Sequence, residues 1–277
     1  MTLRCFVIGH PIAHSRSPLI HGTWLEQHGL GGSYERIDVA PSELPGFVAR
    51  IRAGEFAGGN VTVPHKEAML PLLDEVSEAA CAIGAVNTIW RENGRLYGDN
   101  TDAAGFLGHL DATAPGWQGQ VRTALLIGAG GAARAIAYGL KSRGVVRIIL
   151  ANRGRERANQ LARVLGAPLQ ARDWDERDAL VGEADLIVNT TSLGMKGQPP
   201  LALDLARLRP GTIVDDIVYV PLKTALLTQA EQRGGVIVDG LGMLLHQAVP
   251  GFTRWFGVTP AVTPALRARL ERDILGA

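Results

Sequence analysis

The fold is decided by Thr123-Ala-Leu-Leu-Ile-Gly-Ala-Gly-Gly-Ala-Ala-Arg-Ala-Ile-Ala137, where an apolar run ends in glycines and continues as alanine-rich sequence. This order predicts a buried parallel strand that turns tightly into a helix. Gly128 and Gly130 fit the first two glycines of the dinucleotide-binding fingerprint, and Ala133 takes the third place, where alanine is allowed. A pyrophosphate would bind the N–H groups at the start of this helix. The loop alone is equally compatible with a purely structural turn, and its strand and helix flanks favour binding.

Strands and helices alternate after this stretch. Apolar runs predict further strands at Arg147–Ala151, Leu186–Asn189, Ile213–Asp215 and Val236–Asp239, with helices at 153–165 and 224–233. A repeating strand and helix order of this length indicates a Rossmann-type domain, which we place at residues 104–240.

The first third of the chain has a second alternation of the same kind. Short apolar runs predict strands at Arg4–Ile8, Tyr34–Val39 and Gly59–Val63, with helices after Pro18 and from Ser42. Asn93-Gly94 predicts a hairpin between 86–90 and 95–97, at a sheet edge. Asn100 or Thr101 is suited to cap a helix that ends near residue 109. We therefore expect an α/β domain with a mostly parallel sheet over residues 1–103, followed by the Rossmann-type domain. Two further helices are predicted at 240–256 and 264–275.

Composition excludes several classes of function. The chain has 277 residues, and 28 Lys and Arg balance 27 Asp and Glu, which argues against a nucleic-acid or anionic-membrane surface. No apolar run is long enough to cross a bilayer, and the N-terminus lacks the pattern of a secretion signal. Cys5 and Cys81 have no metal-ligand spacing, so we expect reduced thiols and no metal. The expected protein is cytoplasmic and binds a small molecule.

The residues after the second Rossmann strand indicate which cofactor binds. A domain that binds NAD has an acidic residue at this position, which holds the ribose hydroxyls. Here the sequence is Asn152-Arg153, with Arg155 and Arg157 close behind. Cations would attract a 2′-phosphate, so NADP is favoured over NAD. The alternative is a solvated basic helix start, but cations there oppose the helix dipole unless an anion is bound.

Polar residues cluster where the strands of the first domain end, which is where open α/β sheets bind ligands. They occur in Ser15-Arg-Ser-Pro18, Asn60-Val-Thr-Val-Pro-His-Lys66, Gly84-Ala-Val-Asn87 and Gly98-Asp-Asn-Thr-Asp102. Taken singly, a serine here is more often a helix cap, and a lysine or aspartate is more often solvated surface.

Together with the Gly128-Ala-Gly-Gly-Ala132 loop and Asp239-Gly-Leu-Gly-Met-Leu-Leu-His-Gln247, these segments resemble the shikimate dehydrogenase family, in the same order along nearly the whole chain. The resemblance implies reversible, NADPH-dependent reduction of 3-dehydroshikimate to shikimate, a step towards chorismate and the aromatic amino acids. It also implies that the C-terminal helices, residues 241–277, return to the N-terminal domain. Monomer and homodimer both remain open.

The resemblance assigns roles residue by residue. Lys66 and Asp102 would be the catalytic pair, without deciding which of them transfers the proton. The substrate would be bound by these two and by Ser15, Ser17, Thr62, Asn87, Tyr219 and Gln247. The cofactor would be bound by Gly128, Ala129, Gly130, Gly131, Ala132, Asn152, Arg153, Arg157, Thr190, Ser192, Ile217, Gly240 and Met243.

Two alternatives remain at the level of sequence. A quinate or dual quinate/shikimate dehydrogenase would need room for one more hydroxyl, and serines at positions 15 and 17 leave that room open. A noncatalytic NADP-binding regulator would be expected to lack Lys66 or Asp102, and both are present. Gly22 departs from the family's usual Asn, and the role of Arg155 is left open.

Overall fold

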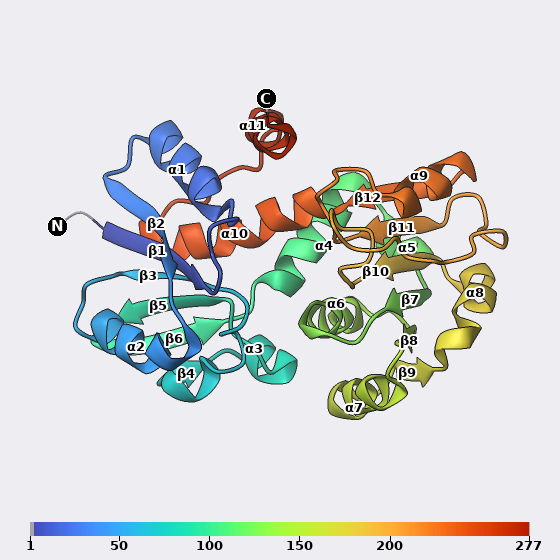
Figure 1. Cartoon of the computed structure of the whole chain (residues 1–277), viewed down its shortest axis with the longest axis horizontal. Coiled ribbons are helices and arrows are strands. Elements are labelled where there is room, and N and C mark those ends of the chain that lie inside the picture. Colours follow the sequence, from blue (N-terminus) through green and yellow to red (C-terminus); the bar gives the residue numbers. More distant parts are fainter. Residues whose placement is uncertain (1–2, 277) are drawn as a thin grey trace. The chain divides into compact units, whose positions relative to one another are not determined.

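Two six-stranded sheets organise the chain, one in each of two compact units (Figure 1). The structure is a computed structural model that describes residues 3–276. Unit 1 comprises the chain up to Thr101 together with Gln247–Asp273, and unit 2 comprises Asp102–His246 with the described residues from Ile274 on. The predicted α/β class is confirmed, because both units combine a sheet with helices.

The sheet of unit 1 has the strand order β2-β1-β3-β5-β6-β4. Its strands are β1 (Leu3–Gly9), β2 (Gly32–Asp38), β3 (Gly58–Val61), β4 (Glu75–Val76), β5 (Thr88–Glu92) and β6 (Arg95–Asp99). Strand β1 pairs in parallel with β2 and β3, β5 runs antiparallel to β3 and β6, and β4 runs parallel to β6. The carboxyl ends of β1, β2 and β3 therefore meet at one edge of the sheet.

The predicted hairpin forms, but not at the edge of the sheet. Asn93 and Gly94 have φ angles of 50° and 79°, the positive values that a tight two-residue hairpin turn requires. Strand β6 has β4 as a further neighbour, so β4 forms the edge. The edge position was wrong because a strand of two residues is too short to show any periodicity.

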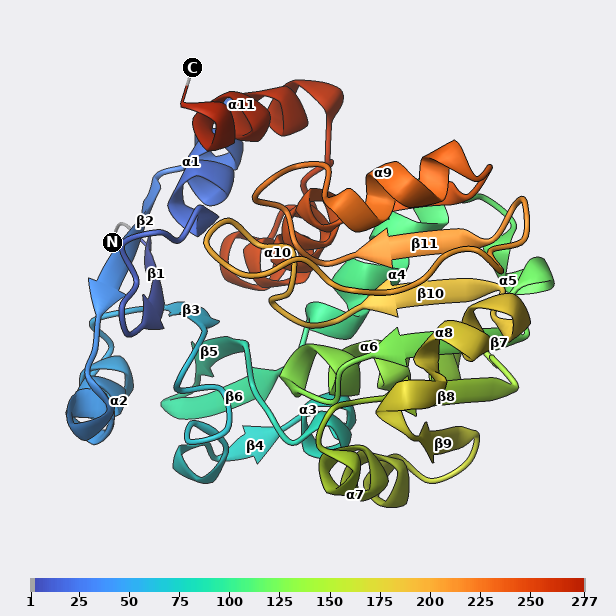
Figure 2. The same cartoon turned by 45° about the vertical axis from the view of Figure 1, so that its right-hand side comes forward.

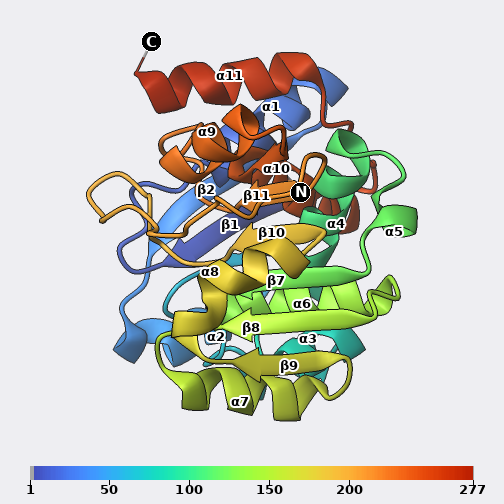
Figure 3. The ribbon, with the colours of Figure 1, turned by 90° about the vertical axis from the view of Figure 1, so that its right-hand side faces the viewer.

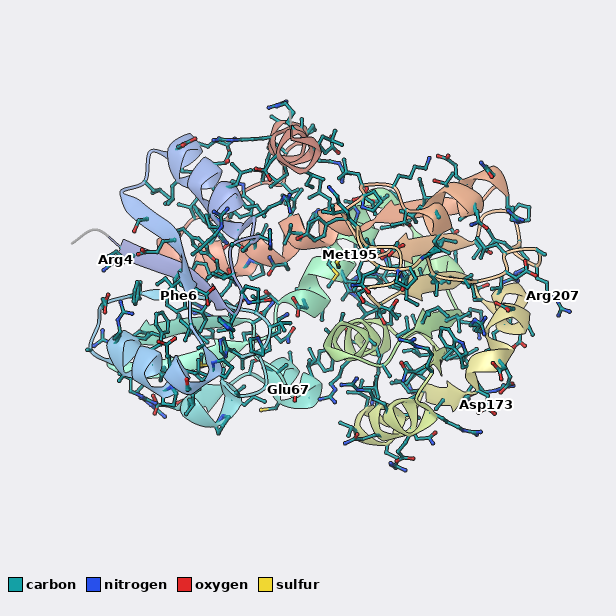
Figure 4. The ribbon with its side chains drawn as sticks, in the orientation of Figure 1. Arg4, Phe6, Glu67, Asp173, Met195 and Arg207 are labelled. Atoms are coloured by element: carbon teal, nitrogen blue, oxygen red, sulfur yellow. The ribbon has the colours of Figure 1, made fainter. Side chains whose placement is uncertain are left out.

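Alternation along β1 creates two apolar faces in unit 1, because successive side chains of a strand point to opposite sides. On one face, Phe6 packs edge-to-face against Phe47 of α2 (Leu44–Arg52) and Phe56, with ring centroids 4.9 and 5.1 Å apart. Phe6 is labelled in Figure 4. On the other face, Cys5 lies with Trp255 of α10 (Gly240–Phe256). Cys5 is buried, whereas Cys81 on α3 (Glu78–Ile83) is exposed.

The chain's last helix and the segment before it make polar contacts with unit 1. Helix α1 (Ser17–His28) carries Trp24, whose Nε1 donates to the carbonyl of Ala261 at 3.2 Å. Arg16, just before α1, forms an ion pair of 2.8 Å with Asp273 of α11 (Pro264–Leu275). The predicted bounds of α10 and α11 are confirmed.

The sheet of unit 2 is entirely parallel, with the order β12-β11-β10-β7-β8-β9 (Figure 2). Its strands are β7 (Thr123–Ile127), β8 (Arg147–Ala151), β9 (Leu169–Arg172), β10 (Leu186–Asn189), β11 (Ile213–Asp216) and β12 (Val236–Asp239). Counted from β7, this is the strand order 3-2-1-4-5-6 of the Rossmann fold, read from the opposite edge. The Rossmann-type prediction is confirmed, and β9 is an edge strand that the sequence did not predict.

Helices lie on both faces of this sheet. They are α4 (Asp102–Thr113), α5 (Trp117–Gln120), α6 (Gly131–Ser142), α7 (Arg155–Leu165), α8 (Arg177–Leu180) and α9 (Ala225–Gln232). Figure 3 shows α8 in front of the strands and α6 behind them. Leu180 of α8 and Leu226 of α9 share a core with the inward side chains of β7 and β8.

The predicted bounds of three helices differ from the structure, and for α9 the difference is one residue at each end. Helix α7 begins at Arg155 rather than residue 153, because Gly154 is its N-cap residue. Helix α4 begins at Asp102, directly after the predicted cap position Thr101, and runs four residues beyond His109, to Thr113. Among the described residues, no helix is both long and apolar enough to cross a membrane.

Candidate active site

The serine loop, residues 10–16, follows β1 and leads into α1. Ser17 is the first residue of α1 and is buried, and the Ser15 and Ser17 hydroxyl oxygens lie 3.3 Å apart. Arg36 of β2 fixes the loop from outside, since its Nε donates to the carbonyl of Ser15 at 2.7 Å. Two hydroxyls this close form a pair of donors suited to one anionic group.

Thr62 and Lys66 lie directly after β3, next to the serine loop. A Cβ added to Gly9 would lie 2.6 Å from the Thr62 methyl carbon, so only glycine allows the two segments this close. The Thr62 N–H donates to the carbonyl of Ile8 at 2.9 Å. The Lys66 carbonyl accepts from the N–H of Val86 at 2.8 Å, which places Lys66 beside the segment that carries Asn87.

Asn87 and Gln247 are both buried and both contact Thr101. The Asn87 side-chain oxygen accepts from the N–H of Thr101 at 2.8 Å, and the Gln247 carbonyl accepts from the Thr101 hydroxyl at 2.9 Å. Asp102 follows Thr101 directly as the first residue of α4. Unit 1 therefore brings together six predicted residues, namely Ser15, Ser17, Thr62, Lys66, Asn87 and Gln247.

In unit 2, the glycine turn lies between the ends of β7 and β10. Gly128 has a φ of +114°, in the region that favours glycine. A Cβ there would lie 2.5 Å from the Thr190 hydroxyl, which itself donates to the carbonyl of Ile127 at 2.7 Å. Gly130 is the N-cap residue of α6, and no side chain caps this helix. Its first N–H groups are suited to an anion such as a pyrophosphate.

The basic segment follows β8, next to this turn. Asn152 folds back to donate to the carbonyl of Gly154 at 2.8 Å, and Arg153 and Arg157 are exposed. Arg155 pairs with Asp173 after β9, with its Nη1 2.6 and 2.8 Å from the two carboxylate oxygens; Asp173 is labelled in Figure 4. Arg155, whose role the sequence left open, is thus bound to a carboxylate in this structure.

Three residues that the sequence did not single out shape the loops after β10 and β11. Asp216 accepts from the Asn189 amide at 2.9 Å and from the Thr224 hydroxyl at 2.7 Å. Burial raises the pKa of Asp216 to about 6, although its hydrogen bonds act in the opposite direction. Polar residues at the end of a buried strand were the available signal. These bonds hold the loops that carry Thr190, Ser192, Ile217 and Tyr219.

The start of α10 packs against the loop after β11. A Cβ on Gly240 would lie 2.2 Å from the carbonyl oxygen of Ile217, so these two predicted cofactor residues lie side by side. The Asp239 side chain accepts from the N–H of Leu241 at 3.0 Å and so caps α10. Met243 follows within the first turn and is half-buried, whereas Ser192 is exposed.

The strand order and the glycine turn of unit 2 define a class of protein, the proteins with a Rossmann-type dinucleotide-binding unit. Family models agree and are more specific. They match the shikimate dehydrogenase substrate binding domain over residues 7–89, shikimate/quinate 5-dehydrogenase over 115–195 and the shikimate 5′-dehydrogenase C-terminal domain over 240–268. The chain belongs to the shikimate dehydrogenase family, as its motifs predicted.

Individual relatives and solved structures extend this result. The shikimate dehydrogenase (NADP(+)) of Azorhizobium caulinodans is 55% identical and covers 98% of this chain and 96% of its own. A Thermus thermophilus shikimate 5-dehydrogenase, crystallised with NADP(H) and shikimate, matches with a TM-score of 0.87 and 39% identity over 98% of this chain and 99% of its own. A Corynebacterium glutamicum quinate dehydrogenase in complex with NAD matches with a TM-score of 0.90 and 32% identity over 100% and 99%.

Proposed function

We propose that this protein catalyses the reversible, NADPH-dependent reduction of 3-dehydroshikimate to shikimate. The observation that carries the proposal is the 55% identity, over 98% of the chain, to relatives named shikimate dehydrogenase (NADP(+)). Unit 1 is the substrate-binding unit in this proposal, and unit 2 binds the cofactor.

In unit 1, Ser15 and Ser17 bind the substrate carboxylate through their adjacent hydroxyls. Thr62, Lys66, Asn87 and Gln247 hold the ring hydroxyls. The family resemblance adds Asp102 as a further ligand of these hydroxyls and Tyr219 as a further substrate contact, both from unit 2. The support is the arrangement around the ends of β1 and β3, where the serine pair lies within 3.3 Å and Gly9 permits close approach of Thr62.

Lys66 and Asp102 form the catalytic pair. NADPH, when bound, supplies the hydride to the substrate carbonyl carbon. Negative charge then develops on the carbonyl oxygen, and the Lys66 ammonium stabilises that charge or supplies its proton. Asp102 positions the ammonium and accepts a hydrogen bond from the neighbouring hydroxyl of the substrate.

In unit 2, the pyrophosphate of NADP binds the loop from Gly128 to Ala132 at the start of α6. The support for this site is the tight turn at Gly128, where any side chain would collide with Thr190, followed directly by the start of α6. The adenosine 2′-phosphate binds Asn152, Arg153 and Arg157. The remaining contacts, nearer the nicotinamide, come from Thr190, Ser192, Ile217, Gly240 and Met243.

The alternative is oxidation of quinate, favoured by the likeness to a quinate dehydrogenase at 32% identity. One experiment decides: the purified protein is given shikimate or quinate, each with NADP or with NAD, and reduced cofactor is followed at equal concentrations. We expect strong preference for shikimate with NADP. Comparable turnover of quinate, especially with NAD, would contradict the proposal and assign dual specificity.

We further propose a cytoplasmic enzyme, supported by Cys5 and Cys81 being free thiols. Size-exclusion chromatography with light scattering distinguishes the monomer from the homodimer.

A further inference from the structure

We propose that Thr88 is a positioning residue that orients the Asn87 amide, so that this amide donates a hydrogen bond to the substrate. This inference rests on the proposed function, because it assigns a role to a residue beside the proposed substrate site. Thr88 is the first residue of β5, and its side chain is buried with 2% exposure. It lies in a line of buried polar side chains that crosses the sheet of unit 1.

The line begins at Tyr34 on β2. Its hydroxyl donates to the side-chain oxygen of Asn60 at 2.5 Å, and its ring stacks on His21 with centroids 4.1 Å apart. Burial raises the pKa of Tyr34, so the phenol keeps its proton and remains a donor. The Asn60 nitrogen donates to the main-chain carbonyl of Asn87 and to the Thr88 hydroxyl, both at 3.1 Å.

These contacts fix the orientation of Asn60 without ambiguity. A main-chain carbonyl can only accept, so the Asn60 nitrogen must face it and the oxygen must face Tyr34. Both amide protons of Asn60 are then used. The Thr88 oxygen accepts one of them, which frees the single Thr88 proton to be donated elsewhere.

That proton goes to Asn87. The Thr88 hydroxyl lies 2.9 Å from the Asn87 side-chain oxygen, which also accepts from the Thr101 N–H at 2.8 Å. A main-chain N–H can only donate, so this end of the Asn87 amide must be the oxygen. The other end is therefore nitrogen, a donor. A substrate atom that meets Asn87 must accept, as a hydroxyl or ketone oxygen does.

The hydroxyl of Thr101 continues the same pattern towards Gln247. It lies 2.9 Å from the Gln247 carbonyl and 3.2 Å from both the Asn87 side-chain oxygen and the Thr88 hydroxyl, so its shortest bond is the one that it donates to Gln247. The direction of donation is thus consistent from Tyr34 to Gln247. Thr88 is the member whose hydroxyl joins Asn60 to the Asn87 side chain, so replacing it breaks this connection without altering Asn87 itself.

The test uses paired substitutions. Thr88→Val keeps the shape but removes the hydroxyl, and we expect the KM for shikimate to rise about tenfold, the effect of losing one hydrogen bond. The KM for NADP should stay within about twofold, because its proposed site is in unit 2. Thr88→Ser keeps the hydroxyl and should restore the KM for shikimate. Thr23→Val is the matched control, since Thr23 is buried and its hydroxyl donates to Leu19 within α1 at 2.7 Å.

A double-mutant cycle separates positioning from general destabilisation. If Thr88 acts through Asn87, then Thr88→Val should have little further effect in an Asn87→Ala background. Equal effects with and without Asn87, or a wild-type KM for Thr88→Val, would overturn the proposal while the proposed function stands. If wild-type protein does not turn over shikimate, the proposed function fails first and the inference fails with it.

Should Thr88→Val not fold, Tyr34→Phe tests the same line from its far end. It removes the hydroxyl that donates to Asn60 and that also interacts with Ser17, so the variant is read together with Ser17→Ala, in which only the second contact is lost. We expect the same selective rise in the KM for shikimate, of a smaller size. An unchanged KM for shikimate in folded Tyr34→Phe would contradict the proposal.

Discussion

Lys66 is the residue on which the chemical step depends most directly. We predict that Lys66→Ala lowers kcat at least about 100-fold, the lower range for general acid–base catalysis, because the developing oxyanion loses its cation and proton source. The measurement is kcat at saturating shikimate and NADP. Glu67→Ala is a suitable control, since Glu67 is the exposed neighbour of Lys66. Near-normal kcat for Lys66→Ala would remove Lys66 from the mechanism.

Arg153 is the residue proposed to distinguish NADP from NAD. We predict that Arg153→Ala raises the KM for NADP much more than the KM for NAD, because only NADP carries the 2′-phosphate. Arg155→Ala should have the smaller effect, since Arg155 is bound to Asp173. Steady-state kinetics with both cofactors measures this. Equal changes for NADP and NAD would show that Arg153 does not contact the phosphate.

At the scale of elements, the loops after β10 and β11 depend on one buried carboxyl, Asp216. Its pKa in the folded protein is about 6, against an ordinary value of 3.8. The folded state therefore binds this proton more tightly than the unfolded state does. The contribution to stability is full below about pH 4, decreases as pH rises to about 6, and is constant above that.

We predict that replacing this carboxyl removes that part of the pH dependence. Between pH 4 and 6.5 the wild type should lose about 3 kcal/mol more than Asp216→Asn does, as expected from a shift of about two pKa units. Urea unfolding across this range measures the difference. Asp175→Asn is the control, because the Asp175 side chain is 98% exposed. Parallel curves for wild type and Asp216→Asn would refute the assignment.

Among the strands, the sequence predicts the long central ones better than the short edge strands. The strands β8, β10 and β12 could be predicted to the residue, because each is an apolar run that stops at or before a glycine or a polar residue. The edge strands β4 and β9 could not, since they are short and are defined by pairing with a neighbour rather than by their own pattern. The pattern of apolar residues therefore predicts the central strands, whereas the edge strands depend on tertiary contacts.

The residues of the candidate site also fall into two groups, those that sequence motifs identify and those that only tertiary contacts identify. Ser15, Ser17, Lys66 and Asn87 lie in motifs that can be read along the chain, and unit 1 gathers them. Tyr34, Thr88 and Asp216 gain their roles from hydrogen bonds to residues distant in sequence or from burial. Only three-dimensional structure reveals such partners.

For the whole molecule, two ligands bound by two units should each stabilise the fold. A ligand at about 100 times its Kd adds about 2.7 kcal/mol by mass action. We predict that NADP and shikimate each raise the Tm by about 5–10 °C, using the usual scaling for chains of this size. Differential scanning fluorimetry measures this, with NAD at the same concentration as the control. An equal shift with NAD would contradict the proposed 2′-phosphate site.

The two cysteines have a practical consequence. Burial raises the pKa of the Cys5 thiol, whereas Cys81 is exposed on α3. Since the thiolate is the reactive form, a maleimide dye or nitroxide spin label should attach to the native protein at Cys81 alone. Helix α3 leads directly into the segment that carries Asn87. The wild-type chain therefore already contains a single spectroscopic reporter position next to its proposed substrate site, and no cysteine needs to be introduced or removed.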